Sequence, residues 1–239
     1  MGLHAWQIMK PIMLAALLAA ACCGGAPTYS LAEEAPTVDD FDWGKEKSTG
    51  IGIASSLSAP SFNFFDVGDL SYYSLYLVHQ VLGSLSNATG VAVDRGLKSS
   101  SLSIVHDTKV FDRLRSEKQH FRVLGISDAV IESLAQRASD DTTTCLTMTH
   151  SDENGDIKFT IILLSEKFNN CLISGLLGSF GIRGTADVTI RTLTSACVLY
   201  EGRRRGLRDR RSLVKETPKL RDVCLAKALE KPSDVNTAK

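Results

Sequence analysis

Six arginines lie within nine residues in the last fifth of the chain, and they are the densest charged feature of the sequence. They are Arg203, Arg204, Arg205, Arg208, Arg210 and Arg211. The guanidinium fork matches phosphate and carboxylate groups, so this segment is a candidate binding site for an anionic partner. Tyr200 is the only aromatic residue nearby, which argues against single-stranded nucleic acid as that partner. A solvated link between two helices and pairing with the acidic residues 33–46 remain as alternatives.

Four cysteines beyond the N-terminal region are the next candidates for chemistry. They are Cys145, Cys171, Cys197 and Cys224. An even number in an exported chain favours two disulfides, and of the three pairings we favour Cys145–Cys171 and Cys197–Cys224, which join neighbours in the chain. No CxxC pair is present, so a zinc site is not expected. Cys171 as a nucleophile with His106 or His150 as its base is the competing interpretation.

Carboxylates and histidines give weaker signals. Glu166 with Asp156 or Glu153 could form an acid–base pair, but a charged turn at a strand end explains these residues more simply. The histidines beyond the N-terminal region are His79, His106, His120 and His150, and none form an i, i+4 pair. We therefore predict no catalytic residue, no metal ligand and no cofactor.

The stretch 161–182 combines an apolar strand with a short helix. Residues 161–164 are apolar, Asn169 or Asn170 can cap a helix, and Gly181 can end it. One side of this helix is an apolar stripe, whereas the opposite side carries only small residues, namely Cys171, Ser174, Gly175 and Gly178. Glycine inside a helix costs about 1 kcal/mol relative to alanine, so the small side needs a packing or functional reason.

This strand and helix, with the turn Phe180-Gly181-Ile182 after it, resemble the central segment of zincin-like metalloproteases, whose helix carries the motif HExxH. Aligning the downstream glycine of some zincins with Gly181 places the first histidine at Ser174, the glutamate at Gly175 and the second histidine at Gly178. Residues 199–201, then 205–207, then a final helix resemble the C-terminal segment of uncharacterised secreted bacterial proteins related to zincins. The catalytic motif is frequently degraded in that group. The resemblance covers residues 62–230.

The resemblance implies a zincin-like fold without the zincin chemistry. Two histidines at i, i+4 bind one Zn²⁺, and the glutamate acts as general base on the bound water. Ser174, Gly175 and Gly178 supply neither ligand nor base, so the resemblance implies a vacated groove at these positions. The expected fold class is α+β, with a zincin-like mixed sheet, a central helix and a C-terminal helical segment.

The N-terminus has the layout of a signal peptide. Lys10 precedes the apolar run 12–21, and Ser30-Leu31-Ala32 fits a peptidase site, so residues 1–32 are the expected leader. A lipid anchor at Cys22 is the alternative, although the usual leucine three residues before it is missing. No later segment is expected to span a membrane. We predict export to the periplasm or the exterior.

The remaining chain is predicted to hold one domain. Residues 33–60 are acidic and then rich in Ser and Gly, which indicates a flexible segment in which Phe41 and Trp43 could be local anchors. The domain is expected over 61–231, with a tail over 232–239. Strands are predicted at 61–65, 91–93, 102–105, 143–149 and 157–164, and helices at 69–88, 109–115, 128–138, 192–200 and 217–231. Asn154-Gly155 predicts a hairpin turn.

Composition excludes little. Lys plus Arg and Asp plus Glu each number 27, so bulk charge favours neither nucleic acid nor a membrane surface. The resemblance to zincins that lack the HExxH residues, together with the leader, implies a non-enzymatic binding or scaffold protein of the cell envelope, with an anionic envelope component or a protein as its partner. The alternative is a hydrolase with an unrecognised active site.

Overall fold

The computed structural model describes residues 41–43, 52–59, 61–68, 70–96, 101–123, 125–138, 142–166, 169–230 and 236–237. The strands are β1 (Ser61–Gly68), β2 (Ala92–Arg95), β3 (Leu102–His106), β4 (Cys145–Ser151), β5 (Ile157–Leu164) and β6 (Asn236–Thr237). The helices are α2 (Tyr72–Thr89), α3 (Val110–Ser116), α4 (Lys118–Val123), α5 (Asp128–Arg137), α6 (Asn169–Gly178), α7 (Ile190–Arg204) and α8 (Arg210–Ala228). All belong to one compact unit, 32–239; the predicted leader and Cys22 lie outside the described residues.

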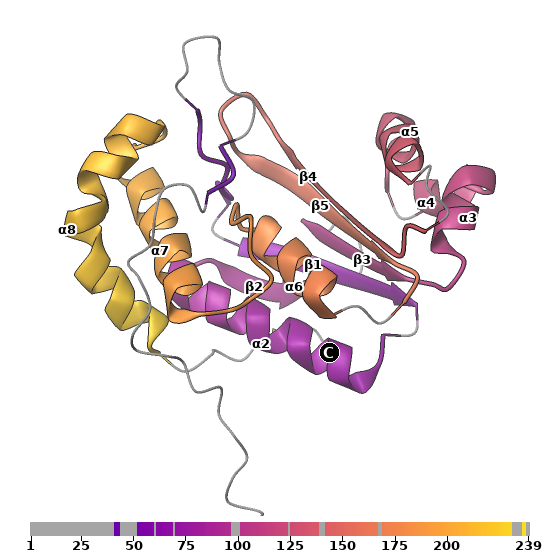
Figure 1. Cartoon of the computed structure of the whole chain (residues 1–239), viewed down its shortest axis with the longest axis horizontal. Helices are drawn as coiled ribbons and strands as arrows, with labels where there is room; N and C mark the ends of the chain where they lie inside the picture. Colours follow the sequence, from indigo (N-terminus) through magenta and orange to yellow (C-terminus); the bar gives the residue numbers. More distant parts are fainter. Residues whose placement is uncertain are drawn as a thin grey trace, which may run out of the picture. The chain divides into compact units, whose positions relative to one another are not determined.

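The strands form one six-stranded sheet in the order β4-β5-β3-β1-β2-β6 (Figure 1). Neighbouring strands run parallel except β4, which pairs antiparallel with β5 at one edge. The predicted α+β class with a mixed sheet is confirmed. Gly155, at φ 76° in the β4–β5 turn, agrees with the predicted hairpin, because a tight turn there needs a left-handed residue.

Helices cover both faces of the sheet. Val105, Ile161 and Leu163 point into a core cluster formed with α3, α4 and α5. On the opposite face α2 and α6 cross the strands (Figure 1). There the Phe64 ring packs against His79 and the Phe62 ring against Phe180. Strand β5 is therefore buried from both sides, as its nearly continuous apolar sequence predicts.

Helix α7 is almost wholly buried and holds α8 against the domain. It spans the predicted helix 192–200 and continues to Arg204, and Cys197 on it is bonded to Cys224 on α8. Its N-cap Thr189 accepts from the Thr192 amide. Hydrogen bonds satisfy buried hydroxyls of α7, since Thr194 donates to the Ile190 carbonyl and Thr192 to the Asp187 carbonyl.

The predicted start of the last helix is wrong. Helix α8 begins at Arg210, because the Asp209 carboxylate caps it by accepting from the Ser212 amide at 3.0 Å. Pro218 lies inside the helix rather than at its first turn. A proline there leaves one i→i−4 bond unmade, and the Thr217 hydroxyl next to it donates to the Leu213 carbonyl.

Residues 41–43 and 52–57, which we name the N-terminal strap, differ from the flexible segment predicted over 33–60. Phe41 and Trp43 are 1% and 4% exposed, and Ala54 to Ser56 are fully buried. Three bridges, Phe41 to Ile182, Ile53 to Asp209 and Ser56 to Asp156, join the strap to loops far along the chain. At the other end, β6 pairs with β2, so the predicted tail contains a short strand.

Candidate functional site

The small side of α6 follows β4 step by step. Cys171 in the first turn is bonded to Cys145 at the start of β4, with their Cα atoms 6.4 Å apart. One turn later Gly175 lies against Thr147, and Gly178 lies against Thr149. Helix and strand therefore run in the same direction, and the three pairs define one surface, which we name the α6–β4 face.

Space differs sharply along this face. A Cβ added at Gly175 would lie 2.6 Å from Ile162 Cδ1 and 2.9 Å from Thr147 Cγ2, closer than side-chain carbons approach. A Cβ at Gly178 would meet only Thr149 Oγ1, at an ordinary 3.6 Å. Gly178 and Ser174, one turn before it, are half-buried. At Gly175 the expected groove is thus filled by side chains of β4 and β5. Ser174 and Gly178, which lie above one another on the adjoining side of the helix, remain partly accessible.

Strand β4 is the outer strand of the sheet beside this face. The Ser165 amide donates to the Thr144 carbonyl, which fixes which β4 residues bond β5. Because antiparallel pairs alternate, the amides of Thr147 and Thr149 point away from β5. The strand has no lysine, glutamate or proline, the residues that commonly protect an edge, and its irregularity lies at its far end, between His150 and Ser151.

Both predicted disulfide pairs are present. Cys145–Cys171 ties α6 to β4, and Cys197–Cys224 ties α7 to α8. The alternative of Cys171 as a nucleophile is wrong, since its sulfur is bonded to Cys145 and carries no thiolate.

The candidate acid–base pair is not brought together. Asp156 precedes β5 and Glu166 follows it, so a strand of eight residues separates them. At about 3.3 Å per residue that is roughly 25 Å. Asp156 instead pairs with Arg203, and the carboxylate of Asp152 in the same turn has its pKa lowered to about 2 by the Lys158 ammonium and by backbone amides.

The histidines have separate surroundings. The His150 ring stacks on Phe159 and the His120 ring meets Phe121 edge-on. Burial and the nearby Arg95 guanidinium lower the pKa of His79. Among the described residues no three His, Cys, Asp or Glu side chains come together as metal ligands.

His106 ends β3 as a buried histidine whose Nδ1 has no hydrogen-bond partner among the residues that the structure describes. It faces the same side of the sheet as α2 and α6, next to Gly68 and Leu164 in the register. The sequence offered it only as a base for Cys171, a role that the disulfide removes. The Ser55 and Ser56 hydroxyls in the strap are likewise buried, with no hydrogen-bond partner in the described part of the chain.

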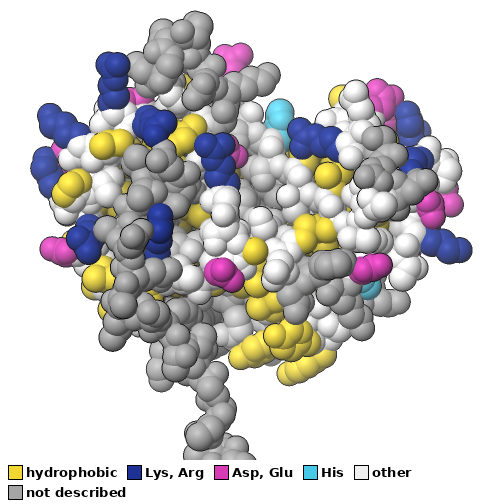
Figure 2. Space-filling view, in the orientation of Figure 1, with side chains coloured by type: hydrophobic (Ala, Val, Ile, Leu, Met, Phe, Trp, Pro, Cys, Tyr) yellow, Lys and Arg dark blue, Asp and Glu magenta, His cyan; other side chains and the backbone are white. Residues whose placement is uncertain are grey.

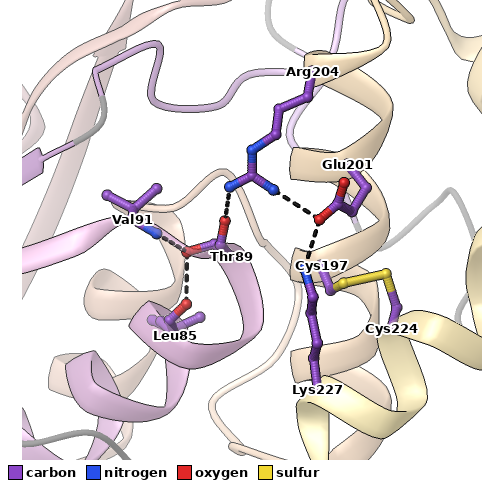
Figure 3. A network of polar contacts seen from close by, with 8 residues as sticks. All are labelled: Leu85, Thr89, Val91, Cys197, Glu201, Arg204, Cys224 and Lys227. Atoms are coloured by element: carbon purple, nitrogen blue, oxygen red, sulfur yellow. Dashed lines mark hydrogen bonds and ion pairs between the residues drawn. A yellow bond between two sulfur atoms is a disulfide. The ribbon is translucent and has the colours of Figure 1, made fainter.

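Two of the six arginines hold the domain together. Arg203, only 9% exposed in its side chain, pairs with Asp156 and donates to the Asn154 carbonyl, and burial lowers its pKa. Arg204 joins α7 to the end of α2 by donating to the Thr89 carbonyl and pairing with Glu201 (Figure 3). Lys227 of α8 binds the same carboxylate, so the pKa of Glu201 is lowered. Sequence reasoning missed these roles, because the partners lie far along the chain.

The other four arginines reach the surface. Arg205, Arg208, Arg210 and Arg211 are exposed at the α7–α8 turn and the start of α8. The Arg210 guanidinium lies 5.9 Å from the centre of the Trp43 ring, a cation–π contact with the strap. Anion binding by this segment stays a prediction, and the exposed arginines are the ones that it concerns.

A shallow surface pocket lies between the α6–α7 loop and the first turn of α7. Its threonine hydroxyls already bond one another and the Asp187 carbonyl, as the Thr189–Thr192 and Thr192–Asp187 contacts show. These bonds close the start of α7 and leave the pocket no free hydroxyl from those side chains.

Comparisons with known protein families, with curated proteins and with solved structures gave no match. Among the helices of the described residues, none is long and apolar enough to cross a membrane.

Proposed function

We propose that the protein is an exported, zincin-like binding protein of the cell envelope that carries no metalloprotease chemistry and binds an extended segment of a partner along β4. The mixed sheet, the helix that follows β5 and the two C-terminal helices support the zincin-like part of this proposal. The two disulfides support export, because such bonds persist in oxidising compartments.

The observation that carries the proposal is the packing at Gly175. The resemblance assigns the general base to this position, and Ile162 and Thr147 fill the space that its side chain would need. A glutamate there would have to displace core side chains of β4 and β5. The segment of α6 that would bear the chemistry is used for close packing instead.

Beside this packed position, β4 has the features of a strand-addition site. An edge strand whose amides and carbonyls face outward can pair with an extended peptide, which gains main-chain hydrogen bonds. Thr147 and Thr149 present such amides, and the half-buried Ser174 and Gly178 leave room for alternate side chains of the partner. Such a partner is a protein segment free of proline at the pairing positions.

Selection from a phage-displayed library of linear peptides tests the proposal. We expect the domain of residues 32–239 to enrich extended, proline-poor peptides and Thr147→Pro to lose them, because proline removes an outward amide while leaving the bonds to β5. Thr147→Val keeps that amide and should bind as the unchanged domain does. Equal enrichment by Thr147→Pro, with its fold intact by circular dichroism, would contradict strand addition.

One observation favours a hydrolase as the second candidate. The Nδ1 atom of His106 is buried and has no hydrogen-bond partner among the described residues, and a ring nitrogen of this kind can act as a general base. Metal analysis of the purified domain with a broad peptidase and esterase screen separates the candidates. Stoichiometric zinc, or turnover that His106→Gln abolishes, would exclude the non-catalytic proposal.

A further inference from the structure

Positive charge is concentrated in one part of this electrically neutral chain. Residues 203–228 contain ten Lys or Arg and three Asp or Glu, a formal charge of +7 that the rest of the chain balances. Figure 2 shows dark blue side chains gathered on the side where Figure 1 places α7 and α8. Arg203 and Arg204 are used inside the domain, whereas Arg205, Arg208 and Arg211 bind no acidic side chain of the described part of the chain.

Helix α8 adds a second feature to this charge. Its inner side is buried through Leu213, Leu220, Cys224 and Ala228. Apolar side chains also occur on its outer side, where Val214, Leu225 and Leu229 are 45%, 37% and 52% exposed; Val223, at 56%, is exposed on a different side of the helix. Exposed aliphatic residues in such a row are unusual for a helix that has only water on its outer side.

The outer apolar residues form a stripe with basic borders. Val214, Pro218, Leu225 and Leu229 follow one another at spacings of four, seven and four, so they lie within about 60° of one another around the helix axis. Arg211, Lys215 and Lys219 lie on one side of this stripe, with the acidic Asp222 among them, and Arg221 lies on the other side. We name this surface the α8 outer face.

We propose that the α8 outer face binds the surface of an anionic phospholipid bilayer, with the apolar stripe at the headgroup boundary and the basic borders on the headgroups. Charge complementarity selects this partner, since α8 itself carries six basic and two acidic side chains. A basic amphipathic helix lies in the bilayer plane through the sum of buried apolar area and attraction to anionic lipid. The domain disulfide Cys197–Cys224 and α7 hold α8 in place, so the face is presented without a folding step.

Vesicle sedimentation of the domain of residues 32–239, which contains every described element and lacks the apolar leader, tests this inference. We expect binding to mixed phosphatidylglycerol–phosphatidylcholine vesicles at low salt, weaker binding at high salt, and none to phosphatidylcholine alone. Arg211→Glu with Lys215→Glu should weaken partitioning by at least about tenfold. Val214→Ser with Leu225→Ser should weaken it by at least about fivefold, because the buried apolar area is lost.

Two controls make the result specific. Lys109→Glu with Arg137→Glu makes the same charge change on exposed residues near α3 and on α5 and should leave partitioning within about twofold. Thr147→Pro should bind vesicles as the unchanged domain does, so failure of the strand-addition proposal and failure of this one are distinguishable. All variants are compared only where their unfolding midpoints agree.

Three outcomes would overturn the inference. They are equal partitioning into neutral vesicles, equal loss in the control pair, and binding that the serine variant leaves unchanged while heparin or DNA competes fully. The last result would identify a soluble polyanion as the partner of the basic residues.

Discussion

At the scale of single residues, two glycines three positions apart in α6 have opposite surroundings. Gly175 is closed in by Ile162 and Thr147, and Gly178 has one ordinary neighbour. The same contrast separates Arg203, which is buried in an ion pair, from Arg205, which is exposed only two residues later. Residue type therefore does not tell which glycine packs and which arginine is available to a partner.

Alanine at the two glycines should change stability in opposite directions. Gly175→Ala should lower the free energy of unfolding by about 1–3 kcal/mol, because the methyl group overpacks a closed site. Gly178→Ala should be neutral or stabilising by up to about 1 kcal/mol, since alanine is the better helix former. Urea unfolding at constant pH measures both; a destabilised Gly178→Ala would show that the accessible end of the α6–β4 face is also closed.

Alanine at the two arginines gives a second contrast. Arg203→Ala should lower the free energy of unfolding by about 3 kcal/mol, because it leaves the largely buried Asp156 carboxylate without its cation. Arg205→Ala should stay within about 0.5 kcal/mol of the unchanged protein. Thermal unfolding checks both values, and a stable Arg203→Ala would argue that the ion pair does not hold the β4–β5 turn to α7.

His79 should make stability fall on mild acidification. Burial and the Arg95 guanidinium lower its pKa, so the folded state favours the neutral ring. The resulting stabilisation is complete above the unfolded pKa of about 6.5 and declines as the pH falls below it. His79→Gln should therefore lose less stability than the unchanged protein between pH 7.5 and 5.5 in urea unfolding; equal losses would assign the effect to other groups.

At the scale of elements, the two disulfides differ in access. Cys145 and Cys171 are half-buried at the outer edge of the sheet, whereas Cys197 and Cys224 are fully buried between α7 and α8. Each bond closes a loop of similar length, because the paired cysteines are 26 and 27 positions apart in the chain. Any difference in how readily the two disulfides are reduced in the folded protein therefore comes from their surroundings.

A mild reductant should open Cys145–Cys171 first. Thiolate attack needs access to the sulfur, so the half-buried Cys145–Cys171 bond should react in the folded protein. The buried Cys197–Cys224 bond should react only after α8 separates from α7. Alkylation followed by peptide mapping at increasing reductant concentrations measures the order. Labelling of Cys224 before Cys171 would show that α8 opens more readily than the α6–β4 face.

The elements predictable from the sequence are those with local signals. β-rich composition, the apolar run of β5 and the Asn154-Gly155 turn located β4 and β5, and the pairing of cysteines that are neighbours in the chain located both disulfides. The start of α8 was missed because Pro218 is a stronger local signal than the Asp209 cap. The filled site at Gly175 could not be predicted, since it depends on which β5 side chain lies opposite.

At the scale of the whole molecule, the N-terminal strap closes the domain. It bonds Gly155 in the β4–β5 turn, Gly181 after α6 and Arg208 after α7. An acidic, Ser- and Gly-rich composition indicates flexibility, but it does not reveal that Phe41 and Trp43 are buried in the folded domain. Only the long-range contacts distinguish this segment from a linker.

Truncating the anchor of the strap should be costly. Phe41→Ala should lower the free energy of unfolding by about 3–5 kcal/mol, as for other fully buried aromatic residues. Tyr72→Ala is the matched control, because that ring is 86% exposed and its loss should cost less than about 0.5 kcal/mol. Chemical unfolding compares the pair, and similar costs for both would mean that the strap adds little to the domain.

The partners of the strap impose an order on how the chain is completed. Synthesis makes the strap before any element of the sheet, yet its bonds to the rest of the domain reach residues far later in the chain, such as the Arg208 carbonyl that accepts from Ala54. These contacts have high contact order and form slowly. A chain that ends at Gly206 contains both strands of the β4–β5 hairpin but lacks Arg208 and Asp209, so protease should cleave its strap more readily than that of the whole domain.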